Sequence, residues 1–277
     1  PGRGHRTGRG HPGRPPRPHR SGMIALVTGA SSGIGAATAR RLAAEPGTRL
    51  VLLARRRERL EALAADIGGA TVIAADLLDE ATPGLVADRV AEEHGRLDLL
   101  VNSAGVGGRG SFAQGGWAEV HRVMAINFDA VVRLTEALLP LLRRSAPSGV
   151  VNIGSVAGRV SRPRVGSYSA SKFALAGWTE AVAMEEARHG VHIGLVQPGF
   201  VPTEGFPQRE LLARPWTRWM LSTDDKVAET ILDVWRDSRP EAYVPKPYGL
   251  VPVARVLLPG LYRRAVASGA FTATPKR

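Results

Sequence analysis

The sequence predicts a single doubly wound α/β domain of the Rossmann type, and three observations lead to this prediction. Short apolar runs alternate with segments of helical length from Met23 to about residue 246. A glycine-rich stretch joins the first apolar run to the first helical segment. Aromatic residues make up only 5% of the chain, so the core consists mainly of small aliphatic side chains, which suits strands buried on both faces. We therefore expect a seven-stranded, mostly parallel sheet flanked by helices.

The apolar runs give the strands and the segments between them give the helices. The expected strands span residues 23–29, 49–55, 70–76, 97–105, 149–155, 192–199 and 241–246. The expected helices span residues 33–45, 56–66, 79–94, 117–144, 167–189 and 223–238. The Rossmann domain is thus assigned to residues 23–246, and no repeat or second core is found.

Residues 1–22 form a basic tail that we expect to be disordered. The tail contains six arginines and no acidic residue, so its six positive charges are half of the chain's net charge of +12. The tail has no apolar periodicity, so it cannot bury enough surface to offset the entropy of ordering. We interpret it as an unstructured extension, for which sequence upstream of an initiating Met23 is one explanation. An arm that binds nucleic acid or an anionic membrane is the alternative, but no aromatic residues accompany the arginines, so nucleic acid is not an expected partner.

Two other segments stand outside the regular alternation. Residues 203–222 carry apolar anchors among charges and prolines, and we interpret them as a flap over a site beyond the strand ends. Residues 247–277 form an apolar and basic C-terminal extension. We expect this extension to pack within the protein, and we keep a cover over the substrate cleft, a contact with a partner subunit and a peripheral membrane contact as alternatives.

The composition excludes several classes of protein. The chain has no cysteine, so disulfides and thiolate chemistry are absent, and a reducing, cytoplasmic location is expected. No uncharged apolar run reaches the length of about 18 residues that a membrane-spanning helix needs. No metal site is expected either.

The stretch TGASSGIG follows the first expected strand and opens the first helix. Glycines in such a turn let backbone N–H groups approach a pyrophosphate, and the helix dipole favours the anion. The residues assigned to this contact are Gly29, Ser31, Ser32, Gly33, Ile34 and Gly35.

The second strand ends in arginines where an NAD-binding domain usually places an acid. An acid would repel a 2′-phosphate, whereas a guanidinium binds it with paired hydrogen bonds. We therefore predict NADP(H) as the cofactor, with Arg55 on the 2′-phosphate and Arg57 solvated. After the third strand, Asp76 and Leu77 are placed to meet the adenine.

The fourth strand ends in NSAG, and its small residues let a cofactor lie against the backbone. Asn102, Ala104 and Gly105 are assigned to this contact. The fifth strand ends at Ser155, at the edge of the sheet where ligands bind.

Tyr168 and Lys172 lie one helical turn apart, 13 residues beyond Ser155. A neighbouring cation stabilises the phenolate and lowers the pKa of a tyrosine, which makes it a usable acid or base near neutral pH. Ser155 is placed to hold a substrate carbonyl oxygen beside the phenol. The sequence therefore predicts a proton-transfer site built from Ser155, Tyr168 and Lys172.

In these motifs and their order the sequence resembles the short-chain dehydrogenase/reductase family, in its single-domain form. NSAG stands where Asn-Asn-Ala-Gly is commoner, which should leave the backbone role intact. The resemblance implies that Asn127 is a fourth catalytic residue, which holds a water linked to Lys172. It implies that Lys172 also binds the nicotinamide ribose, beside Tyr168, and that Arg56 and Ser31 join Arg55 around the 2′-phosphate. It also implies a nicotinamide contact for the PGFVPT stretch, which supplies Pro198, Gly199, Val201 and Thr203.

The predicted function is hydride transfer between NADP(H) and a carbonyl or secondary alcohol, with Tyr168 as the general acid or base. A small-molecule substrate is expected, and the aromatic residues of the flap suggest that it is apolar. The resemblance implies a homodimer or homotetramer that associates through the helices at 117–144 and 167–189. The alternative function is a redox-silent NADP(H)-binding sensor or scaffold with the same fold.

Overall fold

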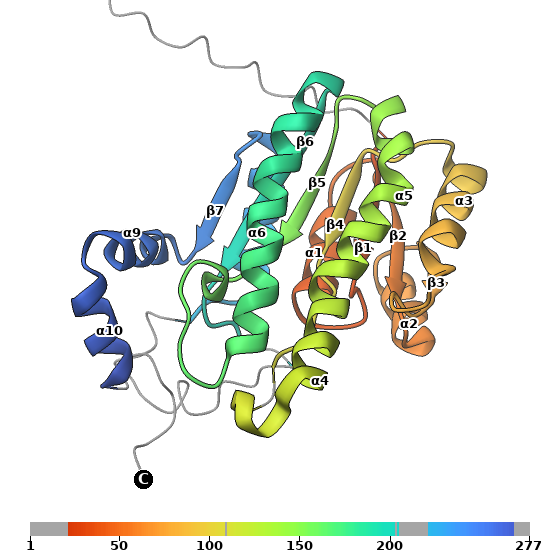
Figure 1. The fold of residues 1–277 in the computed structure, drawn as a ribbon. Coiled ribbons are helices and arrows are strands. Elements are labelled where there is room, and N and C mark those ends of the chain that lie inside the picture. The colour runs from red at the N-terminus through yellow and green to blue at the C-terminus, as the bar shows by residue number, and fades with distance from the viewer. Residues whose placement is uncertain (1–21, 109, 203, 205–220, 269–277) are drawn as a thin grey trace, which may run out of the picture.

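Seven short strands form one parallel sheet in the computed structural model, which describes residues 22–108, 110–202, 204 and 221–268 (Figure 1). The order across the sheet is β3-β2-β1-β4-β5-β6-β7, and every pair of neighbours is parallel. The strands are β1 (Ile24–Thr28), β2 (Arg49–Ala54), β3 (Thr71–Ala74), β4 (Leu99–Asn102), β5 (Ser148–Ile153), β6 (Val191–Pro198) and β7 (Glu241–Val244). The predicted seven-stranded α/β fold is confirmed, with somewhat shorter strands.

The strand order reverses between β1 and β4. The chain builds β1, β2 and β3 toward one edge and then returns to pair β4 with the other side of β1, where Ala25 lies opposite Leu99. In open parallel sheets ligands bind beyond the carboxyl ends of the strands at such a switch point. The topology therefore places a binding site where β1 and β4 end.

Helices cover both faces of the sheet, and each face has its own apolar core. On one face lie α1 (Gly33–Ala43), α2 (Arg57–Asp66) and α8 (Asp224–Arg236), packed on alternate residues such as Ala25 and Val27 of β1. On the other face lie α3 (Thr82–His94), α5 (Ala130–Arg144) and α6 (Gly166–Glu186), packed on Ile24 and Leu26. Because successive strand residues point to opposite faces, burial on both faces requires the continuous apolar runs seen in the sequence.

Local sequence signals set several helix ends. Thr223 caps α8 by accepting a hydrogen bond from the Lys226 N–H, and acidic residues in the first turn complement the helix dipole. α3 ends at Gly95, which has a φ of 68° and adopts the left-handed conformation common after helices.

The predicted helix 117–144 is instead three consecutive segments. α4 (Phe112–Met124) begins earlier, with a capping box between Ser111 and Gln114, and contains a non-helical residue at Gly116. A π-helical turn at Ala125–Asp129 then separates α4 from α5. Single π turns within helices are rare, and the sequence prediction did not include this one.

Two short helices follow β7. They are α9 (Leu250–Leu257) and α10 (Pro259–Ala267), and they lie to one side of the sheet beyond the end of β7 (Figure 1). Short 3-10 turns occur at Val156–Gly158, Ala187–His189 and Lys246–Gly249. Most of the predicted flap at 203–222 lies outside the described residues.

Candidate active site

A cavity of about 650 Å³ opens at the carboxyl ends of the strands and gathers most of the predicted site residues. Those that line it are Gly29, Ser31, Ser32, Gly33, Ile34, Gly35, Arg55, Arg56, Asp76, Leu77, Ala104, Gly105, Ser155, Tyr168, Lys172, Pro198, Gly199 and Val201. Asn102 and Asn127 do not line it, and Thr203 lies outside the described residues. Residues from six loops that are distant in sequence thus meet at the predicted edge of the sheet.

The glycine turn is packed so closely against its neighbours that larger residues would not fit. A Cβ atom on Gly35 would lie 2.4 Å from the carbonyl oxygen of Gly29. Gly29 has a φ of 65°, and a Cβ there would lie 2.9 Å from the Ala104 backbone. Thr28 joins the turn to the end of β4 by accepting hydrogen bonds of 3.0 Å from the backbone N–H groups of Ser103 and Ala104. The glycines are therefore required by backbone packing as well as by any ligand.

The start of α1 is suited to an anion. Ser32 occupies the N-cap position but its side chain makes no capping hydrogen bond, and the first turn contains no acidic residue. The N-terminal N–H groups and the helix dipole favour a negative charge at this place.

Arg56 adds a positive charge beside the start of α1. Its guanidinium donates hydrogen bonds to the Ser31 hydroxyl at 2.9 Å and the Ser32 hydroxyl at 2.7 Å. Arg55, to which the sequence assigned the 2′-phosphate, lies nearer Asp76, with 3.7 Å between the charged atoms. Arg56 is thus the arginine in direct contact with the glycine turn.

Sequence reasoning missed two further charged residues beside Arg56. Arg59, one turn into α2, donates a 2.6 Å hydrogen bond to the Glu204 carboxylate, and Arg56 lies 3.3 Å from the same group. The Arg59 and Arg56 guanidinium groups lower the pKa of Glu204. A carboxylate therefore occupies the position at which two arginines converge. Arg59 could have been found from the sequence as a further arginine near Arg56. Glu204 could not, because it lies 148 residues beyond Arg56 in the chain.

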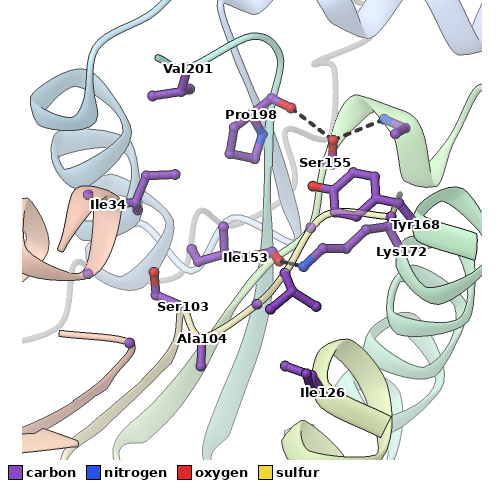
Figure 2. Close-up of a pocket in the computed structure, with 18 of the residues that line it drawn as sticks. Ile34, Ser103, Ala104, Ile126, Ile153, Ser155, Tyr168, Lys172, Pro198 and Val201 are labelled. Atoms are coloured by element: carbon purple, nitrogen blue, oxygen red, sulfur yellow. Dashed lines mark hydrogen bonds between the residues drawn. The ribbon is translucent and has the colours of Figure 1, made fainter. Parts of the chain in front are cut away.

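Tyr168 and Lys172 lie on one face of α6 and point into the cavity (Figure 2). The Lys172 ammonium lies 5.9 Å from the centre of the Tyr168 ring. It donates a 2.7 Å hydrogen bond to the carbonyl oxygen of Ile153, the last residue of β5. α6 and β5 thus hold the two side chains in one place.

Ser155 lies beside the Tyr168 ring and completes the group (Figure 2). Its hydroxyl accepts a 3.1 Å hydrogen bond from the Ala157 N–H and lies 3.4 Å from the Pro198 carbonyl oxygen. Burial raises the pKa of the Tyr168 phenol, and a hydrogen bond between Ser155 and Tyr168 offsets part of this rise. The structure thus brings together Ser155, Tyr168 and Lys172, the three residues for which the sequence predicts proton transfer.

A chain of polar side chains that begins at the buried Gln197, and that sequence reasoning missed, fixes the backbone of Ser155. The Gln197 side-chain oxygen accepts a 2.7 Å hydrogen bond from the Ser155 N–H, and its nitrogen donates to Glu241 at 2.9 Å. Arg159 donates to the same Glu241 carboxylate at 3.0 Å. Gln197 is completely buried, and a Cβ on Gly154 would lie 2.3 Å from its side-chain oxygen. Gln197 stood in a predicted strand, where nothing distinguished it from an ordinary strand residue.

Asn127 lies in the π-helical turn, and its buried side chain bonds to the backbone of Val106 and to the side chain of Ser171. Its oxygen accepts a 2.8 Å hydrogen bond from the Val106 N–H, and its nitrogen donates to the Val106 carbonyl and the Ser171 hydroxyl. The side chain therefore positions the loop after β4 and the start of α6. The π turn interrupts the regular helix ladder at this residue, as often happens near functional sites.

The side chain of Asn102 connects elements of the fold and does not line the cavity. Its side-chain nitrogen donates hydrogen bonds to Asn152 at 2.9 Å and Thr135 at 3.2 Å, and so joins β4, β5 and α5. Asn102 is buried and does not line the cavity, whereas residues of the loop that follows it do, namely Ser103, Ala104, Gly105, Val106 and Gly108.

Burial controls the ionisation of the two proton-transfer residues. Burial raises the pKa of Tyr168 above its usual value. Burial also lowers the pKa of Lys172 from 10.5 to about 8. The sequence predicted a lower pKa for Tyr168 because of the lysine, but desolvation is the largest effect in the structure.

The described parts of the chain contain no cluster of three or more metal-ligating residues and no helix long and apolar enough to cross a membrane.

A doubly wound parallel sheet with a glycine turn and a Ser-Tyr-Lys group at its switch point defines a class of oxidoreductases. The family model described as short chain dehydrogenase matches residues 23–210. The chain belongs to this short-chain dehydrogenase family, as its motifs indicated.

Named relatives include both reductases and dehydrogenases. The chain is 36% identical over 177 residues to a 3-ketodihydrosphingosine reductase of Bacteroides thetaiotaomicron, covering 64% of this chain and 63% of the relative. It is 36% identical over 187 residues to a D-threitol dehydrogenase of Mycolicibacterium smegmatis, covering 66% and 72% respectively. It thus spans less than two thirds of the length of the first of these relatives.

The fold is also similar to solved structures. The complex of Pseudomonas aeruginosa RhlG with NADP superposes with a TM-score of 0.71 at 30% identity, covering 78% of this chain and 90% of that one.

Proposed function

We propose that this protein is an NADP(H)-dependent oxidoreductase that interconverts a carbonyl compound and a secondary alcohol, with Tyr168 as the general acid or base. The observation that carries the proposal is the meeting of Ser155, Tyr168 and Lys172 in the cavity that the glycine turn also lines. Membership of the short-chain dehydrogenase family supports it, because the named relatives are reductases and dehydrogenases.

The residues present fit a dinucleotide with a 2′-phosphate. Gly33 to Gly35 at the start of α1 would hold the pyrophosphate, in a cradle too tight for side chains. Arg56, with Ser31 and Ser32, would hold the 2′-phosphate, with Arg55 beside it. The NADP complex of the similar solved structure supports this choice of cofactor.

The remaining cofactor contacts follow from the lining of the same cavity. Asp76 and Leu77 would meet the adenine, and Ala104 and Gly105 would lie against the nicotinamide half. Lys172 would bind the nicotinamide ribose, as would Tyr168. Pro198 and Gly199 would also contact the cofactor, and Thr203 and the backbone near Val201 would face the carboxamide, as the family resemblance implies.

When bound, the nicotinamide supplies or accepts the hydride at the substrate carbon. In the reductive direction, Ser155 donates a hydrogen bond to the carbonyl oxygen and holds it beside Tyr168. Tyr168 then transfers its phenolic proton to that oxygen as the carbon gains the hydride, so the product is the neutral alcohol and the phenol is left as a phenolate. In the oxidative direction the same phenolate takes the alcohol proton.

The ionisation of the site agrees with this division of roles. The raised pKa of Tyr168 keeps the phenol protonated at neutral pH, as a proton donor requires. With a pKa of about 8, Lys172 is charged at neutral pH and stabilises the phenolate as it forms. Asn127 is proposed to hold a water that reloads the site with protons through Lys172.

The substrate end of the cavity is lined largely by apolar side chains, with the Arg162 guanidinium 5.9 Å from the centre of the Phe200 ring among them. Its lining there comes from Val156 and Val160 after β5, Phe200 after β6, and Val251 and Val266 of the C-terminal helices. Such a lining binds an apolar chain attached to the reacting carbonyl. The substrate name of the Bacteroides relative, 3-ketodihydrosphingosine, supports this class of substrate for our chain.

The experiment is an assay of NADPH consumption with a series of methyl ketones and aldehydes of increasing chain length. Each methylene buried in the cavity is worth about 0.8 kcal/mol, so kcat/KM should rise about threefold to fourfold per methylene until the cavity is filled. NADH is tested in parallel and should be the poorer donor. If no carbonyl is reduced although NADPH binds, the second candidate, a redox-silent NADP(H)-binding protein, is favoured instead.

We also propose that copies of the chain associate as a homodimer or homotetramer through the α4–α5 segment and α6. Met184 of α6 is exposed although it is apolar, which supports a contact at this face. Sedimentation of the Met184→Glu variant tests this, because a buried carboxylate would separate the subunits.

A further inference from the structure

The two C-terminal helices present their apolar side to solvent. Leu257 is 70% exposed and Leu261 is 63% exposed, whereas a surface helix normally turns such residues to the core. The exposed apolar side chains continue from α9 through the corner into α10. We define the C-terminal apolar surface as Leu250, Val253, Val256, Leu257, Leu258 and Leu261.

The opposite side of these helices contacts the body of the protein through polar groups. Arg255 donates a 2.7 Å hydrogen bond to the Arg159 carbonyl oxygen, and its guanidinium lies 5.1 Å from the centre of the Phe173 ring. Tyr262 of α10 donates a 2.5 Å hydrogen bond to the Ser161 carbonyl oxygen. These contacts set the rotation of α9 and α10, so the outward direction of the apolar residues is fixed by specific hydrogen bonds.

The charge of this region indicates which partner covers the surface. The sequence contains no acidic residue from Ala242 to Arg277. Arg263 and Arg264 are exposed on α10, next to the apolar residues. A second copy of the same surface would bring like charges together, which is unfavourable. An anionic bilayer, by contrast, offers apolar chains for the leucines and phosphate groups for the arginines.

The C-terminal apolar surface adjoins the substrate end of the cavity. Val251 of α9 and Tyr262 and Val266 of α10 line the cavity, while neighbouring residues of the same helices, such as Leu250 and Leu261, are exposed. A partner that covers these helices therefore lies beside the cavity that Val251, Tyr262 and Val266 line.

We propose that α9 and α10 lie in the surface of an anionic membrane, with the C-terminal apolar surface inserted among the lipid chains. The attachment is peripheral, because the helices have eight and nine residues and lie along the surface. If the proposed function holds, an apolar carbonyl substrate passes from the lipid into the cavity between these helices. The membrane contact itself does not depend on the chemistry.

The test is co-sedimentation of the full chain with vesicles of phosphatidylcholine, with and without phosphatidylglycerol. Leu257→Glu and Leu261→Glu are compared with Leu85→Glu, which makes the same change at a residue of α3 that is 53% exposed. The basic tail is present in all variants, so its attraction to the vesicles is common to all. We expect each C-terminal variant to lose at least about tenfold in vesicle partitioning, and Leu85→Glu to lose less than about twofold.

A second measurement reports insertion directly and does not depend on a charged variant. Because the chain has no cysteine, a single cysteine can carry an environment-sensitive fluorophore. Emission from a label at Leu257→Cys should shift to the blue when phosphatidylglycerol vesicles are added, and emission from a label at Leu85→Cys should not.

Several results would overturn the proposal. These are no binding of the unmodified chain to phosphatidylglycerol vesicles, equal binding to neutral vesicles, or equal losses in all three glutamate variants. A change of oligomeric mass in Leu257→Glu without a change in vesicle binding would assign the surface to a second copy instead. Reduction of a short, water-soluble carbonyl is measured alongside, and failure there counts against the proposed function and leaves the vesicle result unaffected.

Discussion

Replacing Lys172 by methionine should stabilise the protein at neutral pH while it removes turnover. Lys172 is 5% exposed, and its burial holds the lysine pKa at about 8 instead of 10.5. A charged amine at this place is unfavourable in the folded protein, and methionine fills a similar volume without a charge.

The size of the effect follows from the pKa of Lys172. Each pKa unit corresponds to about 1.4 kcal/mol, so the difference between 10.5 and about 8 disfavours the folded state by about 3 kcal/mol at pH 7. Methionine removes this cost but loses the hydrogen bond to the Ile153 carbonyl, which is worth about 1 kcal/mol. We therefore expect Lys172→Met to unfold at higher urea, with a free energy of unfolding about 2 kcal/mol larger at pH 7.

The sign of this difference depends on pH. The unfolded lysine keeps its proton up to pH 10.5, whereas the folded lysine loses it above about pH 8. The cost of burial is thus complete below pH 8 and decreases as the pH rises toward 10.5. At pH 10.5 it has fallen below about 0.5 kcal/mol, so the methionine variant should be slightly less stable than the unmodified protein.

The assay is urea unfolding followed by circular dichroism at pH 7, 9 and 10.5, without cofactor. Lys226→Met, at an exposed position of α8, is the control and should differ little from the unmodified protein at any pH. A stability difference between Lys172→Met and the unmodified protein that is the same at all three pH values would refute the reasoning, because it would mean that burial does not affect the charge of this amine.

Three further predictions concern the residues around the cavity. Gln197→Leu removes the acceptor for the Ser155 N–H, so kcat should fall about tenfold while the NADPH dissociation constant stays within twofold; an unchanged kcat would show that this hydrogen bond does not position Ser155. Glu204→Gln removes the carboxylate that competes with a 2′-phosphate for Arg56, so NADPH should bind about threefold more tightly in a fluorescence titration, and an equal change for NADH would contradict this. Gly35→Ala places a Cβ 2.4 Å from a backbone oxygen and should weaken NADPH binding at least about tenfold, whereas Gly177→Ala, with open space around it, should leave binding unchanged.

The fold could be predicted from the sequence because its signals are local. A parallel sheet buried on both faces needs continuous apolar strands, and runs such as those ending at Thr28 and Ala54 are of this kind. The division of the helix at 117–144 was not predicted, and the π turn there carries Asn127, whose side chain bonds to Val106 and Ser171. Those contacts come from distant parts of the chain.

The candidate site was predicted where motifs carry it and missed where tertiary packing does. The spacing of Tyr168 and Lys172 on one helix face could be read directly from the sequence. The role of Gln197 could not, because it depends on a register that brings β6 beside Ser155. The predicted decrease in the pKa of Tyr168 was also wrong. The sequence shows the neighbouring lysine, but it does not show how deeply the phenol is buried.

The account depends most directly on proton transfer by Tyr168, and the Tyr168→Phe variant tests it. NADPH binding is measured by fluorescence titration, and single-turnover reduction of the best ketone or aldehyde is measured with the same preparation. Phenylalanine keeps the ring and removes only the hydroxyl, so we predict that the NADPH dissociation constant changes less than about threefold while the reduction rate falls at least about a thousandfold. A variant that binds NADPH and still reduces the carbonyl at a rate near that of the unmodified protein would contradict the account.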